Sequence, residues 1–153
     1  MAQVYLGLGS NLGGKKANLN QAVSLLSQQV GQVLDQSSFF ASKAWGFTSD
    51  NDFFNTVILI ETDLEPFDLL RETQKIEREM GRYEKTKQGY SDRIIDIDIL
   101  FYDDLILNSE ELRIPHPLAT TRDFVLFPMS EIAPDFIHPI EGKTITELKE
   151  IIN

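Results

Sequence analysis

The sequence predicts a single α+β domain, with a mostly antiparallel sheet and helices packed on its faces. Two helical stretches separate short apolar strands in the order strand, helix, strand, strand, helix, strand. That order is the split βαβ pattern of a ferredoxin-like sheet. The chain has 153 residues, of which 42% are hydrophobic and 25% charged, and this suits one domain, residues 1–153, with a core of its own.

The first half of the chain predicts three strands and one helix. Residues Val4–Leu8 are apolar and run into Gly9, which indicates a buried strand followed by a turn. A helix is expected over roughly Lys15–Gln29, because its apolar residues recur at helical spacing. Strands are expected over Val33–Ser42 and Phe53–Thr62, which contain many β-branched and aromatic residues.

A second helix, a loop and a strand should follow. Pro66 suits the first turn of the helix, and Gly81 is placed to end it. The polar residues Arg82–Arg93 then predict a long loop, which we expect to be a lid over a ligand, because loops of this length are often binding segments or lids. The next strand is predicted over Ile94–Tyr102.

The last third of the chain is predicted to be mostly turns. Residues Leu105–Leu107 and Leu112–Ile114 are expected to form a small hairpin. A proline inside a helix removes a hydrogen bond and clashes with the preceding turn. Only Ile145–Ile152 is therefore predicted as a helix here, because the tail contains Pro115, Pro117, Pro128, Pro134 and Pro139.

Composition excludes several classes of protein. The absence of cysteine excludes a disulfide scaffold, a thiolate metal site and a cysteine nucleophile. The net charge of −10 disfavours nonspecific binding to nucleic acid or to anionic membranes. There is no apolar run of the ~20 residues that span a bilayer, and the N-terminus does not resemble a signal peptide. We expect a soluble cytoplasmic protein.

Two acids in the strand predicted over Ile94–Tyr102 indicate a metal site. Side chains alternate along a strand, so Asp96 and Asp98 share one face, roughly 7 Å apart, while Ile95, Ile97 and Ile99 face the core. Two carboxylates on an apolar strand repel each other and lose hydration, which favours a bound cation. Oxygen ligands alone suit Mg²⁺. The alternative is an exposed strand face with two solvated acids.

The loop before this strand is rich in cations. A cationic loop beside two carboxylates fits a polyphosphate that is held by Mg²⁺ and arginines. The alternative is a solvated loop with local ion pairs. No P-loop motif is present, which excludes that class of nucleotide-binding protein. The four basic residues are Arg82, Lys85, Lys87 and Arg93.

An aromatic face beside an amide is a candidate site for a planar ligand. In a strand, Phe53 and Asn55 point to the same side and Phe54 to the other. An aromatic ring next to an amide suits a planar heterocycle, and ordinary core packing is the alternative.

Two further residues each leave two interpretations open. His116 is either a phosphate ligand or a loop residue. Glu77, beside the apolar stripe of the second helix, either has a buried partner or lies at the rim.

Several motifs together resemble a known family. The chain is similar to the 6-hydroxymethyl-7,8-dihydropterin pyrophosphokinases of the folate pathway over nearly its whole length. The most specific signal is an Arg-x-x-Asp-x-Asp strand with Pro-His about 18 positions later. The matching segments are residues 8–13, 53–55, 73–77, 81–82, 93–100, 114–117 and 122–124.

The resemblance implies an ATP-dependent diphosphokinase. Such an enzyme transfers an intact pyrophosphoryl group from ATP to the hydroxymethyl oxygen of the dihydropterin and releases AMP. Asp96 and Asp98 would hold two Mg²⁺ ions. The catalytic residues implied are these two aspartates together with Arg82 and Arg93. The residues implied to bind ATP are Gln74, Arg82, Arg93, Ile99, Arg113, His116 and Arg122.

The resemblance also implies a pterin site. Phe53 and Phe124 would sandwich the pterin, and Asn55 would bind its edge. A tyrosine is usual in the family where Phe53 stands, so a hydroxyl is lost while the stacking surface remains. The backbone of Ala44, Trp45 and Gly46 would line the same pocket. The partners implied are these two small molecules, with neither nucleic acid nor membrane, and the chain is expected to be a monomer.

Three other functions stay open on the residues alone. A ligand-binding module would use the aromatic pocket but would not need paired aspartates. A structural domain would leave the aspartates solvated. Another nucleotide-dependent transferase could use the same Asp-x-Asp site. The pyrophosphokinase interpretation requires that six residues line one cleft, namely Arg82, Arg93, Asp96, Asp98, Asn55 and Phe124.

Overall fold

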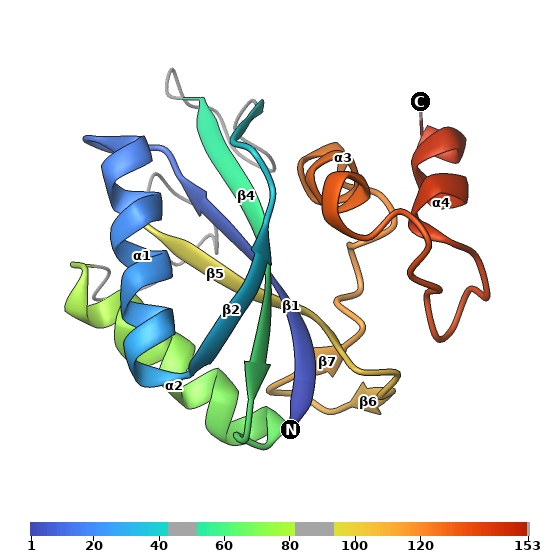
Figure 1. Ribbon diagram of the computed structural model, residues 1–153, viewed down its shortest axis with the longest axis horizontal. Helices are drawn as coiled ribbons and strands as arrows, with labels where there is room; N and C mark the ends of the chain where they lie inside the picture. The colour runs from blue at the N-terminus through green and yellow to red at the C-terminus, as the bar shows by residue number, and fades with distance from the viewer. Residues whose placement is uncertain (43–51, 82–93, 153) are drawn as a thin grey trace.

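The computed structural model describes residues 1–42, 52–81 and 94–152 (Figure 1). The predicted loop Arg82–Arg93 lies outside these residues. The helices of the described chain are α1 (Lys15–Gln29), α2 (Pro66–Glu79), α3 (Asp123–Ile132) and α4 (Ile145–Ile152). The strands are β1 (Ala2–Ser10), β2 (Gly31–Gln36), β3 (Phe40–Ser42), β4 (Phe53–Thr62), β5 (Asp96–Tyr102), β6 (Leu107–Asn108) and β7 (Arg113–Ile114).

The main sheet has the order β2-β4-β1-β5, with β3 also paired to β4, and all of these pairings are antiparallel. The expected α+β architecture is therefore present. Helices α1 and α2 cover one face of the sheet, and α3 and α4 lie on the other side (Figure 1). No helix in the described part of the chain is both long and apolar enough to cross a bilayer.

Each face of the sheet has its own core. Leu6, Leu8 and Ile97 point toward α1 and α2 and pack with buried residues such as Leu26 and Ile76. On the other face, a second cluster joins the sheet to α3 and α4. Its buried members are Val57, Leu100, Phe101, Ala119, Val125, Leu126, Met129, Ala133, Ile145 and Leu148.

A β-bulge in β5 lets two consecutive residues, Leu100 and Phe101, pack into the same core. Tyr5 pairs with Phe101 but Leu6 pairs with Ile99, so Leu100 is an extra residue in β5. Such a β-bulge interrupts the alternation of side chains. Leu100 and Phe101 both belong to the second core as a result. The bulge thus separates the half of β5 that carries the aspartates from the half that packs under α3 and α4.

The single strand predicted over Val33–Ser42 is wrong, because the structure has two strands there, β2 and β3. Between them, Ser37 turns its buried side chain toward β4. Ser37 Oγ lies 3.0 Å from Thr56 Oγ1 and accepts a hydrogen bond of 2.9 Å from the backbone N–H of Val57. The backbone N–H of Ser37 also donates to the Val57 carbonyl over 2.9 Å, so Ser37 bonds to β4 through both its backbone and its side chain where β2 ends.

The tail before α4 is mostly turns, as predicted, but it also contains a helix that the sequence did not predict, because α3 spans Asp123–Ile132 with Pro128 inside it. A proline in a helix interior costs about 3 kcal/mol relative to alanine. Burial offsets this cost, since Val125, Leu126 and Met129 are at most 3% exposed in the second core. The predicted hairpin and C-terminal helix are present as β6–β7 and α4.

Candidate active site

The two aspartates of β5 lie on one face of the strand, as the alternation predicts. Asp96 and Asp98 are half-buried, while Ile95, Ile97 and Ile99 on the opposite side are at most 7% exposed. The apolar side anchors the strand against α1 and α2. The carboxylates consequently project from a fixed support toward the other side of the sheet.

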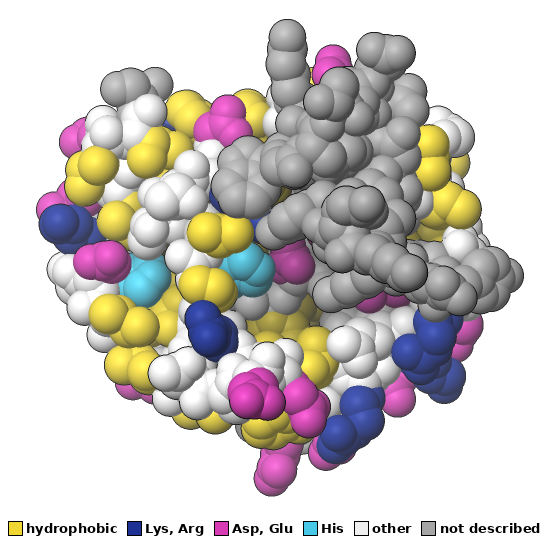
Figure 2. All heavy atoms as spheres, turned by 180° about the vertical axis from the view of Figure 1, so that it is seen from behind, with side chains coloured by type: hydrophobic (Ala, Val, Ile, Leu, Met, Phe, Trp, Pro, Cys, Tyr) yellow, Lys and Arg dark blue, Asp and Glu magenta, His cyan; other side chains and the backbone are white. Residues whose placement is uncertain are grey.

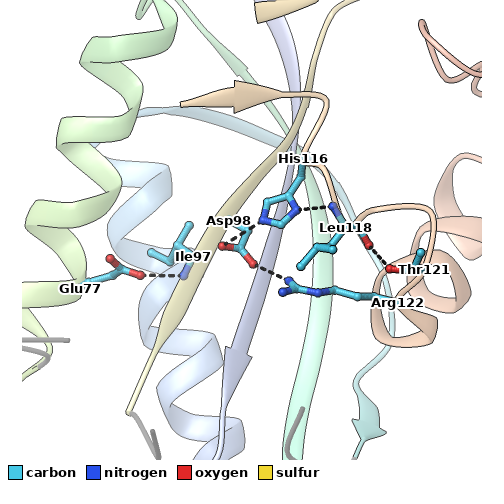
Figure 3. Close-up of polar contacts among 7 residues, drawn as sticks. All are labelled: Glu77, Ile97, Asp98, His116, Leu118, Thr121 and Arg122. Carbon is cyan, nitrogen blue, oxygen red and sulfur yellow. Dashed lines mark hydrogen bonds and ion pairs between the residues drawn. The ribbon is translucent and has the colours of Figure 1, made fainter. Parts of the chain in front are cut away.

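Two basic side chains converge on Asp98 from distant parts of the sequence (Figure 3). Arg122, at the N-terminal end of α3, places Nη1 3.4 Å from Asp98 Oδ2, and its side chain is only 7% exposed. His116, in the segment between β7 and α3, places Nε2 3.9 Å from Asp98 Oδ1. Asp98 of β5 therefore has the buried guanidinium of Arg122 and the imidazole of His116 beside it.

The hydrogen bonds of His116 fix its neutral form. The backbone N–H of Leu118 donates to His116 Nδ1 over 3.1 Å, so Nδ1 is the acceptor and the ring proton is on Nε2, facing Asp98. Burial lowers the pKa of His116 to about 4, with help from the Arg122 charge and against the opposing effect of Asp96. At neutral pH, His116 is an uncharged donor.

A cavity of about 270 Å³ lies beside the aspartates, between α2, β5 and the β6–β7 hairpin. It brings together six of the residues expected at the nucleotide and metal site, namely Gln74, Asp96, Asp98, Ile99, Arg113 and His116. Leu70 and Leu112 add apolar surface, and Glu110 and Glu111 add charge at the hairpin. In the view from behind, histidine and acidic side chains lie close together on the surface (Figure 2).

A row across three strands connects the aspartates to the expected pterin residues. Gly9 of β1 pairs with Asp96 on one side and with Asn55 of β4 on the other. A Cβ atom on Gly9 would lie 3.0 Å from Asn55 Oδ1 and 3.4 Å from Phe53 Cδ1. The glycine therefore leaves the space that lets the Asn55 amide and the Phe53 ring lie over β1.

The Asn55 amide has a defined orientation. Asn55 is 4% exposed, and its Nδ2 donates to the Phe40 carbonyl over 3.1 Å and to Ser42 Oγ over 2.8 Å. Its Oδ1 is the atom that lies next to Gly9. The amide thus presents a hydrogen-bond acceptor on the face of the sheet that carries the aspartates.

Phe124 connects to the same centre through Arg122. The Arg122 guanidinium carbon lies 5.2 Å from the centroid of the Phe124 ring, which is a cation–π distance. Phe124 packs against the second core, on the same side of the sheet as Asn55. The expected pterin residues Phe53, Asn55 and Phe124 therefore share a face with Asp96 and Asp98.

Some expected residues lie outside the described chain, and the structure decides between the two alternatives for Glu77. Arg82, Arg93, Ala44, Trp45 and Gly46 fall in the two ranges that the structure does not describe. Glu77 has a buried partner, because the backbone N–H of Ile97 donates to Glu77 Oε2 over 2.9 Å. The sequence signal for it was an acid beside the apolar stripe of α2.

The donor atoms at β5 fit Mg²⁺. Asp96 and Asp98 supply carboxylate oxygens only, which are the ligands that this ion prefers. Across residues 1–42, 52–81 and 94–152, no group of three or more acidic or histidine side chains is arranged to hold a metal. Two carboxylates suit an ion that completes its shell with water and substrate phosphates.

Comparison with known proteins decides the family. A model of the family "7,8-dihydro-6-hydroxymethylpterin-pyrophosphokinase (HPPK)" matches residues 5–134. The chain belongs to this family. An HPPK relative from Porphyromonas gingivalis, named 2-amino-4-hydroxy-6-hydroxymethyldihydropteridine pyrophosphokinase, is 46% identical over 141 residues, which cover 91% of this chain and 95% of the relative. A relative of the same name from Aquifex aeolicus is 42% identical over 149 residues, with coverage of 97% and 91%.

Solved structures confirm the HPPK fold. A crystal structure of wild-type Plasmodium falciparum HPPK-DHPS matches 98% of this chain with a TM-score of 0.77 at 15% identity. A structure of HPPK-DHPS in complex with substrates gives a TM-score of 0.78 at the same identity. This chain spans less than half of those two chains, 44% and 43%. At this level of identity the match concerns the fold.

Proposed function

We propose that this HPPK chain transfers the intact pyrophosphoryl group of ATP to the hydroxymethyl oxygen of 6-hydroxymethyl-7,8-dihydropterin. The products are AMP and the pterin diphosphate, an intermediate of folate biosynthesis. The observation that carries the proposal is the row Asn55–Gly9–Asp96 beside a cavity lined by Gln74 and His116. It supports a site in which the two substrates meet at the aspartates.

The cavity is proposed as the nucleotide site. Gln74, Ile99 and Arg113 line it between α2, β5 and β7 and suit the nucleoside. The phosphates would then lie toward His116 and Arg122, which offer an uncharged N–H and a buried cation. Arg82 and Arg93, which the family resemblance also assigns to the phosphates, complete the set of residues proposed for ATP.

Asp96 and Asp98 are proposed to hold two Mg²⁺ ions. When bound, the ions would neutralise phosphate charge and increase the nucleophilicity of the acceptor oxygen. The protein's own contribution is positioning and electrostatics, which dominate phosphoryl transfer. The Arg122 guanidinium adds a fixed positive charge at the same carboxylate, and its burial strengthens the interaction.

The face beside Gly9 is proposed as the pterin site. Phe53 and Phe124 would stack on the planar ring, and Asn55 Oδ1 would accept a hydrogen bond from an N–H on the ring edge. Ala44, Trp45 and Gly46 are proposed to line the same site, on the family resemblance. The carboxylates lie one strand beyond Gly9, on the side away from Asn55.

The decisive experiment identifies the nucleotide product. The chain is incubated with ATP, the hydroxymethyl dihydropterin and Mg²⁺, and the products are resolved by chromatography and mass spectrometry. AMP with pterin diphosphate in equal amounts supports the proposal. ADP with pterin monophosphate would instead indicate another transferase with the same metal pair. Ligand binding without any nucleotide product would favour a binding module.

Two further expectations accompany this function. We propose that the chain acts as a monomer, and sedimentation tests this directly. The cytoplasmic location expected from the sequence agrees with a reaction that consumes ATP. Fractionation of cells that express the chain would test it.

A further inference from the structure

Glu77 is a buried acid that lines the proposed nucleotide cavity but to which no substrate contact has been assigned. It lies in the last turn of α2, is 8% exposed, and its Oε2 accepts the backbone N–H of Ile97 over 2.9 Å. Ile97 is the residue between Asp96 and Asp98. Figure 3 shows Glu77 on one side of β5 and Asp98, with its basic partners, on the other.

The contact falls at the outer edge of the sheet. β5 is the last strand in the order β2-β4-β1-β5, so among residues 1–42, 52–81 and 94–152 only one of its edges pairs with another strand of this sheet. Successive backbone N–H groups of a strand point to opposite edges. Because the Ile97 N–H points to Glu77, the N–H groups of Asp96 and Asp98 point toward β1 and their pairs Gly9 and Gly7. Glu77 thus supplies an acceptor at an edge where no strand of the described residues does.

Packing alone does not explain a carboxylate at this position. A buried charge is unfavourable unless hydrogen bonds compensate it, whereas an apolar side chain would fill the same space without that penalty. A hydrogen bond to a carboxylate is roughly twice as strong as one between neutral groups. The position of Glu77 therefore favours a firm hold on one peptide unit, the one that joins Asp96 to Ile97.

We propose that Glu77 is a positioning residue for the metal pair. By holding the Asp96–Ile97 peptide, it fixes the direction in which Asp96 and Asp98 project and so prepares them to bind Mg²⁺ together. The proposal rests on the proposed function, in which this pair is the metal site. Groups that orient metal ligands typically change metal affinity or activity by about 10- to 100-fold when removed.

Two substitutions separate the hydrogen bond from the charge. Glu77→Gln keeps an acceptor oxygen at nearly the same place, whereas Glu77→Met keeps the length of the side chain and removes the acceptor. In the metal-free protein, we expect the amide hydrogen of Ile97 to exchange about 10-fold faster or more in Glu77→Met than in the wild type. In Glu77→Gln it should stay within about threefold of the wild-type rate.

The same variants are then compared by their Mg²⁺ requirement. We expect the Mg²⁺ concentration for half-maximal AMP release to rise about 10-fold or more in Glu77→Met and to change less than about threefold in Glu77→Gln. Thr73→Val is the matched control. Thr73 is buried one turn earlier on α2, and its hydroxyl bonds only within the helix, to the Leu70 carbonyl over 2.9 Å. This control should lower the melting temperature and leave the Mg²⁺ requirement unchanged.

Three results would overturn the proposal. Equal impairment of Glu77→Gln and Glu77→Met would assign the effect to charge. A normal Mg²⁺ requirement in Glu77→Met would mean that the contact does not prepare the pair. A raised requirement in Thr73→Val would indicate general loosening of α2. If the wild type made no AMP, the proposed function would fail, while the exchange rate of Ile97 would still report whether Glu77 holds the strand.

Discussion

Arg122 Nη1 lies 3.4 Å from Asp98 Oδ2, so one carboxylate of the proposed metal pair has a cation beside it within the protein itself. The guanidinium is almost fully buried and stacks on Phe124, which limits its freedom to move. Asp98 therefore contacts the group that would bind phosphate as well as the ion that would bridge it. This shared carboxylate would link the two proposed substrate sites.

Asp98→Asn should abolish AMP release while the fold survives. The side chain is 29% exposed and makes no part of either core, so the amide removes a ligand and a charge without changing volume. Loss of a metal contact worth several kcal/mol predicts a decrease in kcat of about 100-fold or more. Asp104→Asn, at an exposed acid of the turn after β5, is the control. A parallel loss of melting temperature in Asp98→Asn would assign the residue a structural role instead.

Gly9→Ala should weaken pterin binding and leave ATP binding nearly unchanged. The added Cβ would lie 3.0 Å from Asn55 Oδ1, closer than such atoms ordinarily approach, so the amide must shift. Titration calorimetry with the pterin and with a nonhydrolysable ATP analogue measures both affinities. Gly7→Ala is matched on the same strand, but its Cβ meets the flexible end of Leu100 at 3.3 Å. An equal effect of the two substitutions on pterin affinity would count against a pterin site at Gly9.

Phe124→Leu should weaken pterin binding by about 3- to 10-fold, because a stacked ring contributes about 0.5–1.5 kcal/mol beyond its buried area. Leucine keeps an apolar contact with the second core, to which Phe124 is packed. The affinity for the ATP analogue should change less than the affinity for the pterin. The reverse pattern in calorimetry would place Phe124 on the nucleotide side.

His138 should make the fold less stable in mild acid. It is 5% exposed, and its Nδ1 accepts the backbone N–H groups of Ile140 and Glu141, each over 3.1 Å. Burial lowers the pKa of His138, although the nearby Glu141 charge acts in the opposite direction. The unfolded chain therefore binds this proton more readily. The contribution of His138 to stability is complete above pH ~6.5 and decreases as the pH falls below it.

The test for His138 compares melting temperatures from pH 8 to pH 5. In His138→Asn, the amide oxygen can accept the same backbone N–H groups but does not titrate in this range. The wild type should lose more stability than this variant on acidification. Parallel curves for the two proteins would show that His138 does not titrate on unfolding.

The elements that the sequence predicted well are those whose side-chain pattern is local. The alternation of polar and apolar side chains around Asp96 and the apolar stripe of α2 could both be recognised in the sequence, and both are present in the structure. Helix α3 was missed because Pro128 indicates a break, whereas the stability of this helix comes from burial against a sheet that is distant in sequence. The division of β2 from β3 depends on Ser37, whose hydrogen bonds reach across to β4.

The candidate site shows the same difference between local features, which the sequence predicts, and long-range contacts, which it does not. The residue types of the site were predicted, but their proximity depends on strand register. The pairings of Gly9 with both Asn55 and Asp96 cannot be read from spacing along the chain, because they join residues 46 and 87 positions from Gly9. The hydrogen bond from Ile97 to Glu77 has the same origin, since it forms only when α2 packs beside β5.

In the proposed site, the row Asn55–Gly9–Asp96 would act as a fixed spacer between the two substrates. Neighbouring strands lie about 4.8 Å apart, so two steps place the backbone at Asn55 roughly 10 Å from that at Asp96. Backbone hydrogen bonds set this separation, and no side-chain movement can adjust it. In the proposed site, the distance from the pterin edge at Asn55 to the acceptor oxygen would therefore have to match this spacing between strands. An acceptor with one more methylene group between ring and hydroxyl would keep its ring contacts and still misplace the oxygen at the carboxylates.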